Sequence, residues 1–147
     1  MNWDHYFMEI ARTVALRSKD PATRVGAVIV EPGTHAVKAT GYNGMPAGMA
    51  ETPDLWERPT KYQYICHAEA NAIHFAARNG AAVAGCTLYV TGLFPCADCA
   101  KAIVQSGIKR LVVPTDHLNE RWLEEITIAK RILTETGVLW EEFDSVK

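Results

Sequence analysis

Hydrophobic residues recur at two different spacings along this chain, and each spacing indicates one kind of secondary structure. The first segment carries apolar residues at the three- and four-residue spacing of one helix face: Trp3, Phe7, Ile10 and Val14. This spacing predicts an amphipathic helix over residues 3–18 that ends before Asp20-Pro21.

A run of β-branched residues comes next and indicates a strand. Residues 25–30 read Val-Gly-Ala-Val-Ile-Val and precede Pro32-Gly33, a pair typical of a hairpin turn. We therefore predict a return strand over residues 35–40 that ends in Gly41-Tyr42-Asn43-Gly44. Residues 45–64 have no clear periodicity, and a loop of this length inside a compact domain is usually functional or mobile.

From residue 67 onward, helical and strand patterns alternate. The expected elements are helix 67–78, strand 86–91, helix 96–106, strand 111–114, a helix around 122–133 and strand 138–143. Such alternation is typical of a mostly parallel sheet with helices on its faces, and the last helix favours parallel pairing of the strands it joins. The predicted fold class is α/β, a three-layer α/β/α fold with a five-stranded mixed sheet, in one domain over residues 1–147.

Composition and charge narrow the functional classes. The chain is 48% hydrophobic and 22% charged, with a net charge of −2. This charge predicts no large nucleic-acid-binding surface. The four cysteines are too few for a disulfide framework, and no signal peptide or membrane span is evident in the sequence. We therefore expect a reduced, cytoplasmic domain without a membrane partner.

Two short segments have the residue types and spacing of a catalytic zinc site. His67 and Glu69 begin one predicted helix, and Cys96 and Cys99 lie in the first turn of another. A helix N-terminus favours thiolates, and zinc binds imidazole and thiolate tetrahedrally with one position left for water in catalytic sites. We predict that His67, Cys96 and Cys99 hold one Zn²⁺. The pattern H-x-E with P-C-x-x-C is characteristic of zinc-dependent nucleobase deaminases.

The predicted chemistry assigns a separate role to Glu69. Hydroxide formed at zinc attacks an amidine-like carbon that bears an exocyclic amine, and Glu69 carries a proton from the water to the ring nitrogen and then protonates the departing amine. The alternative is a closed structural site with Cys66 as fourth ligand. Because neighbouring helical residues point about 100° apart, we favour Cys66 and Cys86 as small buried residues. The other histidines lack partner spacing and are expected at surface or core positions: His5, His35, His74 and His117.

Several further segments resemble one family closely. They are Lys19-Asp20-Pro21, Gly41-Tyr42-Asn43-Gly44-Met45-Pro46, Lys61-Tyr62 and Gln105-Ser106-Gly107-Ile108-Lys109. Together with the zinc motifs they are similar to the deoxycytidylate (dCMP) deaminases of the cytidine deaminase superfamily. The resemblance implies a cytidine deaminase-like fold and the hydrolysis of dCMP to dUMP and ammonia. The product dUMP would serve as a precursor of dTTP.

The resemblance also implies substrate-binding residues. Asn43 is similar to an asparagine that hydrogen-bonds the nucleotide near its sugar, although Asn-Gly alone also suits a simple turn. The backbone of Ala68 would contact the pyrimidine edge, and Tyr64 is placed among the substrate contacts. A 5′-phosphate needs cations or helix N-termini, and the candidate cations are Arg24, Arg58 and Lys61.

Family members are typically homohexamers that dCTP activates and dTTP inhibits. The resemblance therefore implies a hexamer with dCTP and dTTP as effectors, and Mg²⁺ bound together with the regulatory dCTP. Other zinc deaminase substrates stay open: a nucleoside, guanine, a riboflavin-pathway pyrimidine or a tRNA adenosine. A non-catalytic, zinc-stabilised binding module is the alternative from a different class, and it predicts four protein ligands and no function for Glu69.

Overall fold

The computed structural model describes residues 1–115 and 120–144. Its strands form one sheet in the order β2-β1-β3-β4-β5, with the bounds β1 Gly26–Val30, β2 Val37–Tyr42, β3 Thr87–Val90, β4 Arg110–Pro114 and β5 Leu139–Phe143. The α-helices are α1 Trp3–Ala15, α2 Lys61–Tyr64, α3 Ala68–Arg78, α4 Ala97–Gln105 and α5 Leu123–Glu135. Two 3₁₀ helices are η1 Pro53–Trp56 and η2 Glu120–Trp122.

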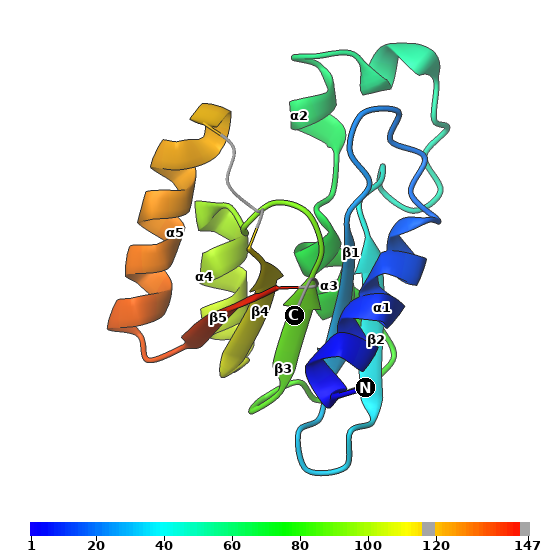
Figure 1. Ribbon diagram of the computed structural model, residues 1–147. Coiled ribbons are helices and arrows are strands. Elements are labelled where there is room, and N and C mark those ends of the chain that lie inside the picture. The colour runs from blue at the N-terminus through cyan, green and yellow to red at the C-terminus, as the bar shows by residue number, and fades with distance from the viewer. Residues whose placement is uncertain (116–119, 145–147) are drawn as a thin grey trace.

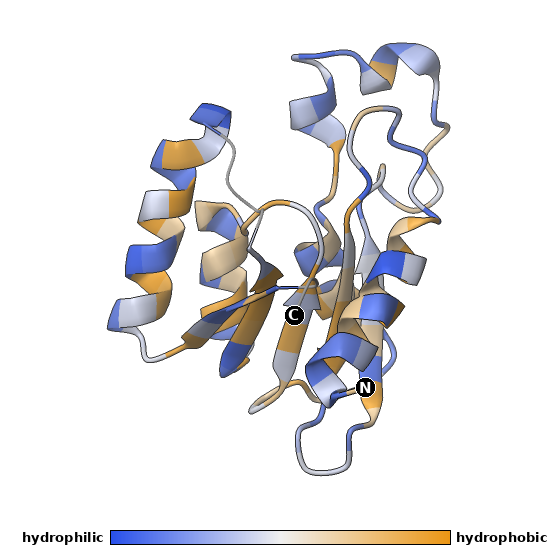
Figure 2. Cartoon of the chain, viewed as in Figure 1, coloured by the Kyte–Doolittle hydropathy of each residue, from blue (hydrophilic) through white to orange (hydrophobic). Residues whose placement is uncertain are grey.

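The sheet lies between two helical layers, as the three-layer prediction requires. Alternate residues of a strand point to opposite faces. Ala27 and Ile29 of β1 therefore join the core under α3, α4 and α5, while Val28 and Val30 join the core under α1. Figure 1 shows α1 on one face of the sheet and the other long helices on its far side. Hydrophobic colouring in Figure 2 follows the strands and the helix sides that meet them.

Strand direction is mixed within this sheet. β3 and β4 are parallel, and so are β4 and β5, which confirms the predicted pairing across the last helix. β1 is antiparallel to both of its neighbours, so the sheet is less parallel than the alternation alone predicts. The short hairpin makes β1 antiparallel to β2, and β1 then lies between β2 and β3.

This topology brings two helix N-termini together. Because β2 and β3 are each antiparallel to β1, they run in the same direction and end at the same edge of the sheet. After β2 the chain passes through η1 and α2 and returns where Cys66 pairs with Gly44, so that α3 begins beside the end of β2, and α4 begins after β3. The crevice beyond the carboxyl ends of such strands is the usual ligand site of α/β folds.

Gly41 allows α3 to approach β2 closely. A Cβ atom added at Gly41 would lie 2.4 Å from the backbone nitrogen of Ala72 and 2.5 Å from the carbonyl oxygen of Ala68. No side chain fits in that space, so glycine at this position sets the distance between α3 and the sheet. The N-terminus of α3 is thereby held at the end of β2.

Most element bounds agree with the sequence prediction to within one or two residues, and the larger or more informative differences lie in the first half of the chain. Helix α1 ends at Ala15 instead of residue 18, because Ser18 is buried and donates a hydrogen bond to the carbonyl oxygen of Asn43. Strand β2 extends to Tyr42, and the predicted 45–64 loop contains η1 and α2. Among the helices of the described residues, none has the length and apolar character to cross a membrane.

Candidate active site

The three predicted zinc ligands meet at the two helix N-termini. His67 is the N-cap of α3, Cys96 is the N-cap of α4, and Cys99 lies in the first turn of α4. His67 Nδ1 is 3.5 Å from Cys96 Sγ and 3.4 Å from Cys99 Sγ. Among the described residues, this is the group of His, Cys, Asp and Glu whose ligand atoms all lie within 4.8 Å of one another.

These distances fit a tetrahedral zinc ion. Zinc–nitrogen bonds of ~2.0–2.1 Å and zinc–sulfur bonds of ~2.3 Å at a tetrahedral angle separate the nitrogen and sulfur atoms by about 3.6 Å. The two separations, 3.5 and 3.4 Å, are close to that value. One imidazole and two thiolates are also a donor set that zinc prefers, so the residues present fit the metal.

Cys66 and Glu69 lie outside the ligand group. The Cys66 backbone instead pairs with Gly44, through hydrogen bonds of 2.7 and 3.1 Å. The closed site with Cys66 as fourth ligand therefore has no support in the geometry, while an open site with three ligands does. Cys86 is buried, as predicted, whereas Cys66 is only half-buried. His117 lies outside the described residues.

The ligand side chains influence one another's protonation strongly. A hydrogen bond from Cys99 lowers the pKa of the Cys96 thiol to about 4, helped by His67. The hydrogen bond to Cys96, together with burial, raises the pKa of Cys99. The hydrogen bond to Cys96 raises the pKa of His67 to about 9 against the effect of burial. A bound cation needs thiolates and a neutral imidazole, so metal binding at this site releases protons.

Glu69 lies one residue further along α3 than Ala68, in the first helical turn. Only 5% of its surface is exposed, and burial raises the pKa of its carboxyl group. A carboxylate whose pKa is raised accepts a proton more readily than an ordinary carboxylate and can still return it. Glu69 thus has the properties of a proton carrier next to the metal ligands.

A cavity of about 400 Å³ opens in front of these residues. Its lining includes His67, Glu69 and Cys96 together with apolar side chains such as Ile65 and Phe94. Ala68 also lines it and is the first residue of α3, so its N–H group has no acceptor within the helix. A mainly apolar cavity with a few convergent polar groups is typical of small-molecule sites.

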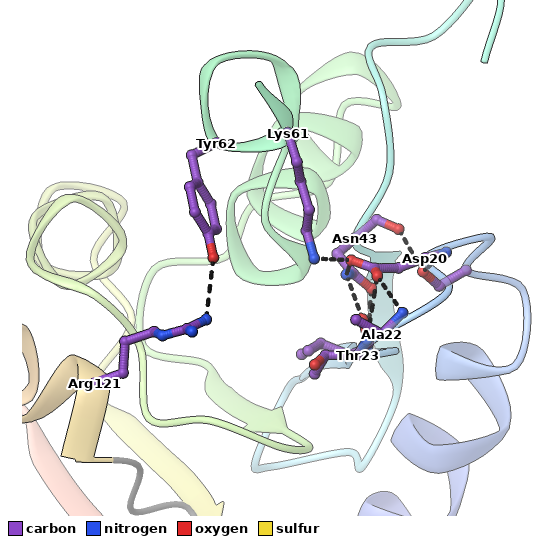
Figure 3. A network of polar contacts seen from close by, with 9 residues as sticks. Asp20, Ala22, Thr23, Asn43, Lys61, Tyr62 and Arg121 are labelled. Carbon is purple, nitrogen blue, oxygen red and sulfur yellow. Dashed lines mark hydrogen bonds and ion pairs between the residues drawn. The ribbon is translucent and has the colours of Figure 1, made fainter. Parts of the chain in front are cut away.

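Asn43 lines the same cavity but is held by the protein on three sides. Its Nδ2 donates to Asp20 Oδ2 at 3.2 Å and to the Thr23 carbonyl oxygen at 2.9 Å. Its Oδ1 accepts a hydrogen bond of 2.8 Å from the Val25 backbone. Both amide hydrogens are therefore used, and a lone pair of Oδ1 is the remaining hydrogen-bonding position. Figure 3 shows this network.

The candidate phosphate ligands lie in different surroundings. Arg58 lines the cavity, and within the described residues its guanidinium has no hydrogen bond or ion pair. Lys61 also lines the cavity but is buried in an ion pair with Asp20. Arg24 and Tyr64 are exposed and are not among the described residues of the lining.

Several residues of the cavity were not assigned a role by the sequence, among them Asp20, Tyr62 and Trp122. Asp20 is buried at 2% exposure, and the sequence marked it only as part of the family-like segment Lys19-Asp20-Pro21. Tyr62 and Trp122 line the cavity with ring centroids 5.6 Å apart. Trp122 matched the apolar face of the last helix in the sequence, yet it lies in η2, one residue before α5.

Taken together, the sheet edge, the His/Cys/Cys group and the buried carboxylate define a metal-dependent enzyme of the α/β class. Residues 1–115 match the family described as the cytidine and deoxycytidylate deaminase zinc-binding region. The chain therefore belongs to the cytidine and deoxycytidylate deaminase family.

Individual relatives agree with this assignment. The chain is 43% identical to the deoxycytidylate deaminase of Mus musculus, over 97% of this chain and 80% of that protein. It is 41% identical to the Homo sapiens deoxycytidylate deaminase over the same shares. A crystal structure of dCMP deaminase from the cyanophage S-TIM5, in complex with dCMP and dUMP, superimposes with a TM-score of 0.75 at 29% identity, covering 94% of each chain.

Proposed function

We propose that this protein hydrolyses dCMP to dUMP and ammonia with one zinc ion bound by His67, Cys96 and Cys99. The observation that carries the proposal is a three-ligand site with a buried carboxylate, Glu69, on the wall of a cavity. The deoxycytidylate deaminases to which the chain is similar support dCMP as the substrate. Zinc, when bound, supplies a water molecule whose pKa is lowered toward neutrality.

Glu69 moves the protons of the reaction. It accepts a proton from the attacking water and delivers it to ring nitrogen N3, which makes C4 more electrophilic. It then takes the remaining proton from the new C4 hydroxyl group and delivers it to the amine, which leaves as ammonia while the C4 carbonyl bond forms. The burial that raises the pKa of Glu69 supports this role, because a carboxyl group of ordinary pKa would return a proton poorly at neutral pH.

The remaining substrate contacts follow from the cavity walls. The Ala68 N–H group, at the first position of α3, is suited to the carbonyl oxygen of the pyrimidine. Asn43 Oδ1 keeps one lone pair, which is suited to a sugar hydroxyl group. The apolar side chains of Ile65 and Phe94 are suited to the ring faces.

Arg58 is the phosphate ligand in this proposal. Its guanidinium lines the cavity without a described partner, and guanidinium groups bind phosphate in a bidentate manner. Lys61 has a carboxylate partner, and Arg24 and Tyr64 lie outside the described lining. These surroundings favour Arg58 over the other candidates.

A substrate panel tests the proposal. The zinc-loaded protein should release ammonia from dCMP faster than from deoxycytidine, CMP, guanine or a tRNA. Arg58→Ala should raise the KM for dCMP roughly tenfold or more, as expected for the loss of a charged hydrogen bond, and leave deoxycytidine turnover nearly unchanged. Arg78→Ala, an exposed arginine at the end of α3, is the matched control. A greater loss in Arg24→Ala than in Arg58→Ala would contradict the phosphate assignment.

A single domain over residues 1–147 and a cytoplasmic location are parts of the proposal that rest on the sequence pattern and composition. A homo-oligomer of the hexamer type, and regulation by dCTP and dTTP with Mg²⁺ bound to the regulatory dCTP, rest on the family resemblance alone. Light scattering with and without these nucleotides would test the assembly. Velocity curves at low dCMP would test the effectors.

A further inference from the structure

Lys61 is among the most buried cations of the described chain. Its Nζ lies 2.7 Å from Asp20 Oδ2, and the two side chains are 8% and 1% exposed. A buried charge whose partner is removed is costly, typically by several kcal/mol, because it is left without solvent or a counter-ion. The position of the Lys61 ammonium group is therefore determined by Asp20.

Asp20 in turn connects Lys61 to Asn43. The same Oδ2 atom that contacts Lys61 accepts the hydrogen bond from Asn43 Nδ2. The other carboxylate oxygen accepts from the backbone nitrogens of Ala22 and Thr23, at 2.8 and 3.1 Å. Asp20 thus has four donors from three segments of the chain. Without Lys61 the Asp20 carboxylate would lose its only cationic donor among these four, and its buried negative charge would be less well balanced.

Asn43 has its side-chain orientation fixed by this carboxylate. An amide side chain can rotate by 180° and exchange its oxygen and nitrogen atoms. With Asp20 and the Thr23 carbonyl as acceptors, Nδ2 must face them, so Oδ1 faces the Val25 backbone nitrogen. An altered Asp20 would weaken the preference for this orientation of Asn43.

Lys61 also attaches α2 to the rest of the cavity. Figure 3 shows Lys61 and Tyr62 extending from α2 toward different parts of the molecule. Tyr62 meets Trp122 edge to face and accepts a 3.5 Å hydrogen bond from Arg121. Lys61 reaches Asp20 on the opposite side. The pair Lys61–Asp20 therefore attaches α2 to one side of the cavity, and the contacts of Tyr62 attach it to the other.

We propose that the buried Lys61–Asp20 pair is a positioning device, which orients Asn43 for the substrate and holds α2 as a wall of the cavity. Lys61 is then a positioning residue and not a ligand of the substrate phosphate. This inference rests on the proposed deamination of dCMP. It assigns the effect of Lys61 to the nucleoside part of the substrate, which Asn43 contacts.

The first experiment compares a nucleotide with its nucleoside. In Lys61→Gln, kcat/KM should fall about tenfold for both dCMP and deoxycytidine, at enzyme concentrations that make the slower nucleoside reaction measurable. The ratio of the two values should stay within about twofold of wild type. A loss confined to dCMP would make Lys61 a phosphate ligand, and unchanged kcat/KM for both substrates would reduce the pair to a structural role; either result overturns the inference.

The second experiment tests whether Lys61 acts through Asn43. In an Asn43→Ala background, Lys61→Gln should lower kcat/KM for dCMP by less than threefold, because the residue that it positions is already gone. The same tenfold loss in both backgrounds would overturn the inference. Zinc content and thermal unfolding of each variant establish that it is folded, and Asp20→Asn replaces Lys61→Gln if the latter does not fold.

The wild-type protein separates this inference from the proposed function. If wild type releases no ammonia from dCMP, both fail. If wild type is active and Lys61→Gln changes the ratio of nucleotide to nucleoside turnover, only the inference fails.

Discussion

Two buried carboxylates in this protein have opposite protonation behaviour. Burial is the largest influence on both, and at Glu69 it raises the pKa. At Asp20 burial also acts to raise the pKa, but hydrogen bonds from Lys61, Ala22 and Thr23 together lower it. Environments that separate the pKa values of like groups usually separate their roles. Glu69 is suited to carry protons, and Asp20 is suited to hold other side chains in place.

Replacing Glu69 by glutamine should abolish turnover and keep the metal. The amide has nearly the same shape but cannot accept and return a proton, and loss of a general acid–base group costs roughly 10²- to 10⁴-fold in rate. We expect kcat for dCMP to fall by this factor in Glu69→Gln, with one zinc per chain by atomic absorption. Glu124→Gln, on the exposed side of α5, is the matched control and should retain full activity. Normal turnover in Glu69→Gln would rule out the proton-carrying role.

Residue types and their spacing predicted the reacting groups of the site, but they did not predict the contacts that hold the surrounding side chains in place. His67, Cys96, Cys99 and Glu69 could be identified because zinc binding requires particular donors at particular helical positions. The surroundings of Lys61 and Arg58 could not be predicted in this way. Whether a cation faces a ligand or a buried carboxylate depends on Asp20, about 40 residues away in the sequence, and on the path of the intervening chain.

At the scale of secondary structure, the contact between α3 and β2 positions the site. Gly41 is the residue that permits this contact, although the sequence indicated only a turn or a family motif at Gly41-Tyr42-Asn43-Gly44. Hydrophobic periodicity located the long helices and the strands. It missed α2 and η1, because helices of four residues are too short to display a periodic pattern.

Gly41→Ala should destabilise the protein and reduce activity together. The added methyl group would lie within 2.5 Å of the α3 backbone, so α3 must move away from β2, at a cost of about 1–3 kcal/mol. Urea denaturation should detect the loss of stability, and kcat for dCMP should fall because Glu69 moves with α3. Gly44→Ala is the matched control, since a Cβ atom there has no neighbour within 4 Å. Equal stability of the two variants would contradict the close packing of α3.

For the whole molecule, an ion-pair network connects α1 to three strands of the sheet. Arg110 of β4 donates to both carboxylate oxygens of Asp4, at 3.0 and 2.8 Å, and to Glu141 of β5 at 2.7 Å. Tyr89 of β3 donates to Asp4 at 2.6 Å. The hydrogen bond from Arg110 lowers the pKa of Asp4 against the opposing effect of burial, and Tyr89 lowers it further.

This lowered pKa predicts how stability depends on pH. Because the folded pKa of Asp4 lies below the unfolded value of about 3.9, the network stabilises the protein fully above that value and loses this contribution as the pH falls through the folded pKa. Asp4→Asn should therefore lower the free energy of unfolding at pH 7, and its difference from wild type should shrink as the pH falls below about 4. Exposed Asp54→Asn serves as the control. A constant difference across this range would contradict the role of the Asp4 carboxylate.

The sheet order of the whole molecule was only partly predictable. Alternating patterns predicted β3, β4 and β5 as a parallel set, and the pairing of β4 with β5 was expected from the helix between them. The position of β1 between β2 and β3 could not be predicted. The pattern of residues within each strand does not specify which other strand becomes its neighbour in the sheet. That position is what places the N-termini of α3 and α4 at the same edge.

The central claim is that zinc-loaded protein converts dCMP to dUMP by adding water at C4. Incubation with dCMP in ¹⁸O-labelled water tests it most directly, with mass spectrometry of the nucleotide and a parallel ammonia assay. We predict dUMP with one ¹⁸O atom in its new carbonyl group, one ammonia for each dUMP, and neither product after zinc is removed by a chelator. Absence of dUMP from the wild-type reaction, or undiminished formation of dUMP by the zinc-free protein, would contradict the account.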